Sequence, residues 1–572
     1  MCGILFGLTR DPTVFPEYWE SLALANQKRG PDSQSLVTQT LNEVALHWYG
    51  AVLHLRGEYN VPQPIVESEN VLCWNGEIFN GLEVPVDSND TEILSKKLNE
   101  TELNNERVLE VFSQVQGPYG FFYFEKSKEK LWFGRDCLGR RSLLWHLPKH
   151  SEDSFVLSSV GPENQCPEGY WEEVPAKGIY CLDMTQGFDH LNFADRLTLH
   201  EWHFKEEIEF MRLPYGRINT SLPQTNDLLA IEGEEMPIPS ELMTETIQTL
   251  IQTLGDSVRR RVVNIPKEGP TAQPRLGILF SGGIDCICLA LLADKFLPED
   301  EPIDLLNVAF ENPRIQKHAN KSNKKTVNEQ KAINYDVPDR KTGRQGVEEL
   351  RNVASNRKWN FVEINIPFEE AMAKRDYILS LMAPLNTVMD LSIAMAFWFA
   401  SRGVGGIASD PEQPNVLQDY VSPAKVLLLG IGADEQLAGY SRHREHFRHK
   451  GWEGLIEEIQ FDVDRISTRN LGRDDRIISS HGKEARFPYL DEKLVEFLNS
   501  LPIYLKTDMR FERGIGEKLL LRLAAQELGL VNASRFWKRA IQFGARTAKM
   551  EDNKEKGNHS LKKEIDLEST NQ

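Results

Sequence analysis

Hydrophobic positions in the first two hundred residues fall into short runs that are separated by turn residues. The runs are rich in aromatic and β-branched side chains, which favour β-strands. They are Ala45–Tyr49, Ala51–Leu55, Val71–Trp74, Gly120–Phe124, Leu131–Phe133 and Phe155–Ser158. So many short strands predict a layered antiparallel β domain flanked by helices.

A different pattern begins near residue 240. Glu241–Arg261 has the apolar spacing of an amphipathic helix. The apolar run Leu276–Phe280 is followed by a glycine-rich turn and by a helical segment, Ile284–Leu292. Leu305–Ala309 and Val426–Leu429 are two further candidates for buried strands. Strand, glycine-rich turn, helix and strand in this order predict a parallel, doubly wound α/β sheet.

Polar segments indicate how the chain is divided. From Leu213 to Ser240 it is acidic and rich in proline, which is typical of a linker. We therefore predict a first domain over residues 2–200, a linker over 201–240 and a second domain over 241–550. The hydrophilic stretch His318–Gln330 is expected to be an exposed insertion. Residues 551–572 are charged and contain few apolar positions, which predicts a disordered tail.

Composition narrows the classes of function. The net charge of −19 argues against a nucleic-acid binder, which must neutralise phosphates, and the basic run Arg442–Lys450 is expected to be a solvated helix face. No apolar run approaches the ~20 residues of a membrane span, and no signal-peptide pattern opens the chain. The 7 cysteines are odd in number and scattered, without the spacing of a disulfide framework or a zinc site. A reduced cytoplasmic enzyme that acts on small molecules fits best.

The first candidate for chemistry is Cys2, in the run Met1-Cys2-Gly3-Ile4. Methionine aminopeptidase removes Met1 before a small residue, which would leave the Cys2 thiol beside a free α-amine. A thiolate is a strong nucleophile, and an α-amine with a pKa near ~8 is a suitable base. Alone the feature is weak, because most cysteines are small buried apolar residues.

Two segments downstream offer partners for such a nucleophile. Asn75-Gly76 follows the predicted strand Val71–Trp74, and it forms either a hairpin turn or an oxyanion hole from the Asn75 amide and the Gly76 N–H. Asp90 either grips a substrate ammonium or caps a helix over residues 91–98.

These segments together resemble class II glutamine amidotransferase domains. The matching motifs are Met1–Ile4, Arg29–Asp32, Asn75–Asn80, Asp90–Glu92 and Arg135–Arg140, in that order. The resemblance implies an Ntn-type αββα sandwich that hydrolyses glutamine to glutamate and ammonia. It assigns the nucleophile to Cys2, the oxyanion hole to Asn75 and Gly76, and the anchor of the glutamine α-amine to Asp90.

One position departs from that family. The arginine that usually binds the glutamine carboxylate falls on Val52 when the positions are counted back from Gln63-Pro64. Arg56 lies four residues further on, which is the same face if the strand continues. We therefore expect Arg56 to bind the glutamine carboxylate.

The turn Ser281-Gly282-Gly283-Ile284-Asp285-Cys286 lies between a predicted strand and a helix, where backbone N–H groups form a nest for phosphate oxygens. A glycine-rich turn without a ligand is the alternative. The segment resembles the Ser-Gly-Gly-x-Asp-Ser signature of ATP pyrophosphatases, with Cys286 in place of the final serine. The resemblance implies ATP as cosubstrate, pyrophosphate bound by Ser281, Gly282, Gly283, Asp285 and Cys286, and Mg²⁺ bound by Asp285.

Four later segments resemble the synthetase domain of asparagine synthetases. In Gly430–Tyr440, Asp434 matches a second carboxylate for Mg²⁺-pyrophosphate, whereas Ile431 replaces a glutamate. The charges in Asn470–Arg476 and His481–Asp491 are expected to form a buried ion-pair network. In Trp537–Gly544, Lys538 is the candidate for stabilising negative charge during adenylation, with Arg539 as the competing position.

Three hypotheses remain from the sequence. The leading one is a glutamine-hydrolysing, ATP-dependent ligase of the asparagine synthetase type, which converts aspartate to asparagine through an acyl-adenylate. The second is the same ligase with another carboxylate acceptor. The third is a non-catalytic regulatory relative; Ile431 and the displaced arginine favour it, and the retained Cys2, Asn75, Asp285 and Asp434 oppose it.

Overall fold

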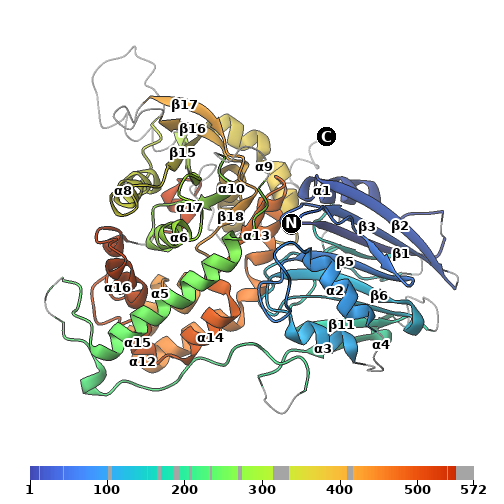
Figure 1. The fold of residues 1–572 in the computed structure, drawn as a ribbon, viewed down its shortest axis with the longest axis horizontal. Helices are drawn as coiled ribbons and strands as arrows, with labels where there is room; N and C mark the ends of the chain where they lie inside the picture. Colours follow the sequence, from blue (N-terminus) through green and yellow to red (C-terminus); the bar gives the residue numbers. More distant parts are fainter. Residues whose placement is uncertain are drawn as a thin grey trace, which may run out of the picture.

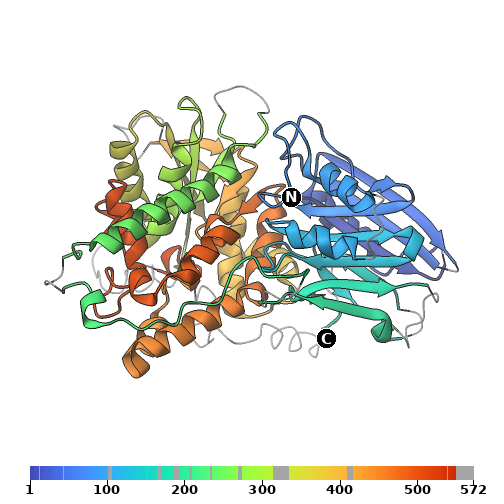
Figure 2. The same ribbon diagram turned by 60° about the horizontal axis from the view of Figure 1, so that its bottom comes forward.

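The computed structural model describes residues 1–548, except 12, 43, 101–105, 151–152, 164–168, 186–192, 205–208, 232, 234, 268–272, 314–333, 409–415 and 538. It consists of a β-rich N-terminal body and a larger C-terminal body that lie side by side (Figure 1). The segment between them runs along the C-terminal body before it reaches α5, as two views show (Figures 1 and 2).

The N-terminal body contains two stacked antiparallel sheets. In the described residues, their strand orders are β10-β8-β9-β1-β3-β2 and β12-β11-β7-β6-β5-β4. The strands are β1 (Gly3–Thr9), β2 (Ser33–Leu41), β3 (Val44–Val52), β4 (Ile65–Glu67), β5 (Asn70–Gly76), β6 (Tyr119–Glu125), β7 (Lys130–Arg135), β8 (Leu144–His146), β9 (Phe155–Ser158), β10 (Glu172–Glu173), β11 (Gly178–Asp183) and β12 (Leu197–Glu201).

Alternation along the strands separates the layers of this body. Phe6 of β1 packs between the sheets against Phe122, whereas its neighbour Leu5 packs against α1 (Trp19–Arg29) on the outer face. Helices α2 (Asp90–Asn99) and α3 (Arg107–Gln114) cover the outer face of the second sheet. The short elements of this body are η1 (Lys126–Lys128) and α4 (Phe193–Arg196), and η3 (Thr225–Asp227) lies in the segment between the two bodies. The αββα sandwich is therefore confirmed.

The C-terminal body is built on one sheet with the order β17-β16-β15-β14-β13-β18-β19. The strands β15, β14, β13, β18 and β19 are parallel, and β16 and β17 form an antiparallel edge. The strands are β13 (Leu276–Leu279), β14 (Ile303–Phe310), β15 (Trp359–Ile366), β16 (Val404–Ala408), β17 (Leu417–Val421), β18 (Val426–Leu428) and β19 (Glu484–Arg486). The helices are α5 (Glu241–Val262), α6 (Ile284–Asp294), α8 (Pro338–Val353), α9 (Phe368–Met382), α10 (Val388–Arg402), α11 (Ala433–Gln436), α12 (Ser441–Asp464), η4 (Ile466–Thr468), α13 (Leu471–Ser479), η5 (Pro488–Leu490), α14 (Glu492–Ser500), α15 (Ile503–Lys506), α16 (Leu519–Glu527), η6 (Ala533–Arg535) and α17 (Ile541–Gly544).

Helices cover both faces of this sheet. Consecutive residues of β14 show the division, because Leu305 packs with α5, α6 and α16, whereas Leu306 packs with α9, α10 and α13. The doubly wound α/β sheet is confirmed. Its chain passes from β13 to β14 on one side and later returns to β18 on the other, so the strand order reverses between β13 and β18. Such a switch point is where open α/β sheets bind ligands.

Several local expectations need correction. Residues 45–49 and 51–55 were predicted as separate strands, but β3 runs unbroken through Gly50 and ends at Val52. A side chain at Gly50 would meet the Gln63 carbonyl oxygen at 2.4 Å, so this glycine permits a close approach and makes no turn. The expected insertion His318–Gln330 and the tail 551–572 both lie wholly outside the described residues.

The basic run Arg442–Lys450 forms the expected solvated helix face only in part, since Arg448, His449 and Lys450 are exposed. It lies in α12, but His443 is buried and its Nε2 lies 2.9 Å from Asp462 Oδ2. Arg444 is buried as well, and donates to the backbone oxygen of Met509 (3.0 Å). Among the described residues, no helix combines the length and the apolar character that a membrane span requires.

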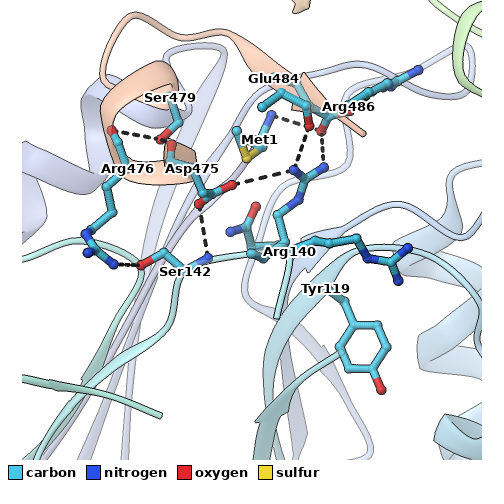
Figure 3. Close-up of polar contacts among 12 residues, drawn as sticks. Met1, Tyr119, Arg140, Ser142, Asp475, Arg476, Ser479, Glu484 and Arg486 are labelled. Atoms are coloured by element: carbon cyan, nitrogen blue, oxygen red, sulfur yellow. Dashed lines mark hydrogen bonds and ion pairs between the residues drawn. The ribbon is translucent and has the colours of Figure 1, made fainter. Parts of the chain in front are cut away.

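The interface between the two bodies contains buried charges. Arg29 of α1 is 1% exposed and its Nη2 lies 2.8 Å from Asp475 Oδ2 in α13. Arg141 pairs with Glu484 (3.1 Å), which also faces the Met1 amine (3.5 Å). Figure 3 shows Glu484 beside the Met1 amine and Asp475 beside the Ser142 N–H, which donates to it (3.1 Å). The expected buried ion-pair network is thus confirmed.

Replacement of Asp475 by alanine should strongly destabilise the protein, because Arg29 and Arg141 would stay buried without their shared carboxylate. The expected loss of unfolding free energy is roughly 3–5 kcal/mol, measured from the midpoint of guanidinium unfolding. Glu457→Ala is the control, since Glu457 forms an exposed pair with Lys450 and its loss should leave the midpoint unchanged. Equal midpoints for the two variants would contradict the prediction.

Candidate functional site

Cys2 and Asn75 lie together at the end of β5. The Cys2 backbone N–H donates to Asn75 Oδ1 at 3.1 Å, so the carbonyl of this side chain is oriented toward Cys2. The Asn75 Nδ2 is buried, and no acceptor among the described residues binds it. An unpartnered buried donor is costly, and this one therefore remains available for a ligand oxygen beside Cys2.

Gln63 is a residue of this site that the sequence did not predict. Its Oε1 accepts the Trp74 backbone N–H (2.7 Å), and its Nε2 consequently faces the Cys2 sulfur at 3.6 Å. Burial raises the pKa of the Cys2 thiol above its usual value, and the nearby N-terminal amine opposes that shift. The thiol therefore needs a base before it can act as a nucleophile.

Asp90 and Arg56 meet around one backbone unit. Asp90 accepts the Ile78 N–H at 3.0 Å, and Arg56 donates to the Ile78 carbonyl oxygen at 2.5 Å. The alternative role of Asp90 as a helix cap is wrong, since the Asn89 side chain caps α2. The assumption that Arg56 continues the strand is also wrong, because β3 ends at Val52. A loop brings the arginine to Asp90 instead.

The predicted phosphate turn connects β13 to α6, at the switch point of the sheet. Gly282 has a φ of +78°, and a Cβ on it would lie 2.3 Å from the backbone nitrogen of Gly343 in α8. Thr342 of the same helix donates to the Ser281 carbonyl oxygen (3.0 Å). Only glycine at 282 allows α8 to pack this closely against the turn.

Lys518 joins the two carboxylates that the sequence singled out. Its Nζ lies 2.7 Å from both carboxylate oxygens of Asp285 and 2.7 Å from Asp434 Oδ1. Although burial opposes it, the charges of Asp285 and Asp434 raise the pKa of Lys518. The structure therefore brings Asp285 and Asp434 together, as a metal or pyrophosphate site requires, around a buried ammonium that was not predicted.

A cavity of about 480 Å³ opens at this point. It is lined by the residues 281–286 and by Asp434 and Lys518, and Ile431 contributes to its wall. Arg539, the competing position for the late cation, is exposed and also lines it. Lys538, the candidate named from the sequence, lies outside the described residues.

The donor set fits a hard cation that arrives with a phosphate. In the described part of the chain no group of three or more His, Cys, Asp or Glu side chains could hold a metal by itself. Mg²⁺ commonly binds through one or two carboxylates together with substrate phosphates. Asp285 and Asp434 meet that requirement.

Helix α13 connects the two sites. Its Arg473 and Asp474 line the cavity, and its next residue, Asp475, pairs with Arg29. The Nε of Arg29 in turn donates to the Cys2 carbonyl oxygen at 3.3 Å. The same short helix therefore contacts both the nucleophile region and the cavity.

Comparisons with known proteins agree with both halves. Residues 1–162 match the family model of the glutamine amidotransferase domain, and residues 448–566 match that of asparagine synthase.

Relatives of similar length extend the match to nearly the whole chain. A protein of Mus musculus named asparagine synthetase domain-containing protein 1 is 40% identical, over 97% of this chain and 98% of its own length. Its namesake in Homo sapiens is 41% identical over 97% and 96%. A putative asparagine synthetase [glutamine-hydrolyzing] 1 of Methanocaldococcus jannaschii is 24% identical over 93% and 86%. The chain therefore belongs to the asparagine synthetase family of ATP-dependent amidotransferases, within the group named asparagine synthetase domain-containing protein 1.

Proposed function

We propose that the protein is a glutamine-hydrolysing, ATP-dependent amide ligase that converts aspartate to asparagine. The observation that carries the proposal is the arrangement around Lys518, which gathers Asp285 and Asp434 beside the phosphate turn. The alternative, a glycine-rich turn that binds no ligand, does not explain why two carboxylates and a buried cation converge beside it.

Glutamine hydrolysis is assigned to the N-terminal site. The Cys2 sulfur attacks the carboxamide carbon, and the oxyanion is stabilised by Asn75 Nδ2 and the Gly76 N–H. Collapse of the intermediate expels ammonia and leaves a thioester, which water converts to glutamate. The base is the α-amine of Cys2, freed by removal of Met1. It takes the proton that burial keeps on the thiol and passes it to the departing nitrogen, which leaves as ammonia.

Glutamine is held by the charges around Ile78. Asp90 accepts hydrogen bonds from the substrate ammonium, and the Arg56 guanidinium binds its carboxylate. Both groups are buried, which strengthens such contacts relative to water.

Adenylation is assigned to the cavity. The N–H groups of the Ser281–Cys286 turn and the Lys518 ammonium bind the ATP phosphates, with Asp285 and Asp434 as the residues that would hold Mg²⁺. When bound, Mg²⁺ would neutralise charge on the phosphates. The acceptor carboxylate oxygen attacks the α-phosphorus and pyrophosphate leaves. Ammonia then attacks the acyl carbon, AMP departs, and Lys538 or Arg539 offsets negative charge near the reacting groups.

A second candidate keeps both half-reactions and changes the acceptor. The specific observation in its favour is Ile431, which contributes an apolar side chain to the cavity wall where related synthetases carry a glutamate. Release of pyrophosphate in a panel of carboxylic acids, aspartate included, decides between the two acceptors. No release with any acid would indicate the non-catalytic relative.

Cys2→Ala should abolish amide formation from glutamine and leave formation from ammonia intact, because only the first route uses the thiol. AMP and amide are measured with each nitrogen source in the presence of ATP, Mg²⁺ and aspartate. Cys181→Ala is a matched control, since Cys181 is buried in β11 and should not alter either route. Persistence of the glutamine reaction in Cys2→Ala would rule out the assigned nucleophile.

Asp285→Ala should abolish pyrophosphate release with glutamine and with ammonia alike, since it removes one of the two carboxylates at the phosphate turn. Glutamate release from glutamine is the control measurement, because the cysteine site lies in the other body. Unchanged pyrophosphate release would remove Asp285 from the site.

Lys518→Met should lower stability at pH 7.5 by about 3 kcal/mol, because two carboxylates lose their shared buried cation. In the wild type the pKa of Lys518 is raised. Its contribution to stability is therefore complete at neutral pH, and it is lost only when the pH rises above the usual pKa range of lysine. In the variant, the opposed carboxylates gain protons as the pH falls, so the deficit should shrink at pH 5. Urea unfolding midpoints at both pH values test this, and a deficit that grows at pH 5 would contradict it.

A further inference from the structure

Asp339 occupies a defined place at the edge of the cavity. It lies in the first turn of α8, beyond the carboxyl end of β14, and its side chain lines the cavity while the residue is only 5% exposed. The Asn307 side chain fixes the backbone there, since its Nδ2 donates both to the Phe280 oxygen (2.8 Å) and to the Asp339 oxygen (3.0 Å). The carboxylate is therefore buried and held beside the phosphate turn.

Most of the other acids that line the cavity have cationic partners, and Glu435 accepts a hydrogen bond from the Tyr440 hydroxyl. Asp390 and Asp474 bind Arg473, and Asp285 and Asp434 bind Lys518. In the described residues no hydrogen-bond donor reaches the Asp339 carboxylate, and Arg539 supplies the one neighbouring charge that acts on it. Burial accordingly raises the pKa of Asp339 to about 7. An unpartnered buried carboxylate is costly.

The opposite side of this carboxylate is covered by a glycine. A Cβ at Gly544 of α17 would lie 2.0 Å from both oxygens of Asp339, so the carboxylate is accommodated only because this position lacks a side chain. One turn further along α8, Thr342 contacts Ser281. The carboxylate is thus confined between α17 and the cavity, next to the place assigned to the phosphates.

An ordinary structural role does not account for Asp339. An acid in the first turn of a helix is stabilised by the helix dipole, which would lower its pKa; here burial dominates and the pKa rises. Asp336 lies three residues earlier and is exposed, and it forms an ion pair with Arg344. A solvated acid at this end of the helix is thus paired with a cation.

If the adjacent turn binds the phosphates of a nucleotide, the nucleoside part of the same molecule carries hydrogen-bond donors that the Asp339 carboxylate lacks. Ribose offers hydroxyl groups and adenine an exocyclic amine, and an acid after the strand next to the phosphate turn is a known way to bind a ribose hydroxyl in doubly wound folds. We infer that Asp339 is a nucleoside-recognition residue that accepts a hydrogen bond from the ribose or the amine of ATP. The inference rests on the proposed use of ATP in this cavity.

Calorimetric titration with ATP tests it. Asp339→Ala should weaken ATP binding by about 10- to 100-fold, the range for a hydrogen bond to a charged group, and Asp339→Asn, which keeps one acceptor, should be intermediate. Gly544→Ala should also weaken binding, because the added methyl displaces the carboxylate. Asp336→Asn is the matched control and should bind ATP as the wild type does. Thermal unfolding of each variant verifies that it is folded.

ATP analogues identify the donor. With 2′-deoxyATP or 3′-deoxyATP, the loss caused by Asp339→Ala should disappear if the ribose is recognised. With purine riboside triphosphate, which lacks the amine, it should disappear if the base is recognised. Equal ATP affinity in wild type and Asp339→Ala, or a loss that persists with all three analogues, overturns the inference and leaves the ligase proposal standing. Absence of ATP binding in the wild type overturns both.

Discussion

The buried ion pair between Arg29 and Asp475 is the interaction on which the arrangement of both sites depends. Arg29 is the last residue of α1 and also donates to the Cys2 carbonyl oxygen, so it fixes the position of the Cys2 backbone. Asp475 belongs to α13, whose preceding residues line the cavity. Charges removed from water are tolerated only when each is fully partnered. The contact therefore specifies one relative position of the two bodies, and with it one spatial relation between the cysteine and the cavity.

The two sites differ in how they are prepared for ligands. At the N-terminal site, Asn75 Nδ2 is a buried hydrogen-bond donor beside Cys2, and no acceptor in the described residues binds it. In the cavity the carboxylates of Asp285 and Asp434 already share the Lys518 ammonium. The first site is thus preorganised for an oxyanion, whereas the second must exchange or extend existing contacts when phosphates arrive. That contrast follows from burial: a neutral amide can remain unpaired at modest cost, and two adjacent carboxylates cannot.

Local patterns in the sequence predicted both architectures and most of the residues that the structure brings together. Short apolar runs marked the strands of the sandwich, and glycines after an apolar run marked the phosphate turn. What the sequence did not reveal depends on contacts between distant segments. Gly50 resembles a turn, but its role is to admit Gln63, which lies elsewhere in the chain. Asn89 and Asp90 are both good caps, and only the position of Ile78 decides between them.

The lysine of the cavity illustrates the same limit. Lys518 precedes an apolar helical run, where a lone lysine has no distinctive pattern, and its significance comes from Asp285 and Asp434, which are remote in sequence. The fold has a further consequence for modularity. If the bodies were separated, Arg29 and Arg141 would remain on one half without their acidic partners. Asp475 and Glu484 would remain on the other half without these arginines. Neither half is therefore an interchangeable cassette: a gene fusion or domain transplant would have to carry both faces of the interface to keep either site in shape.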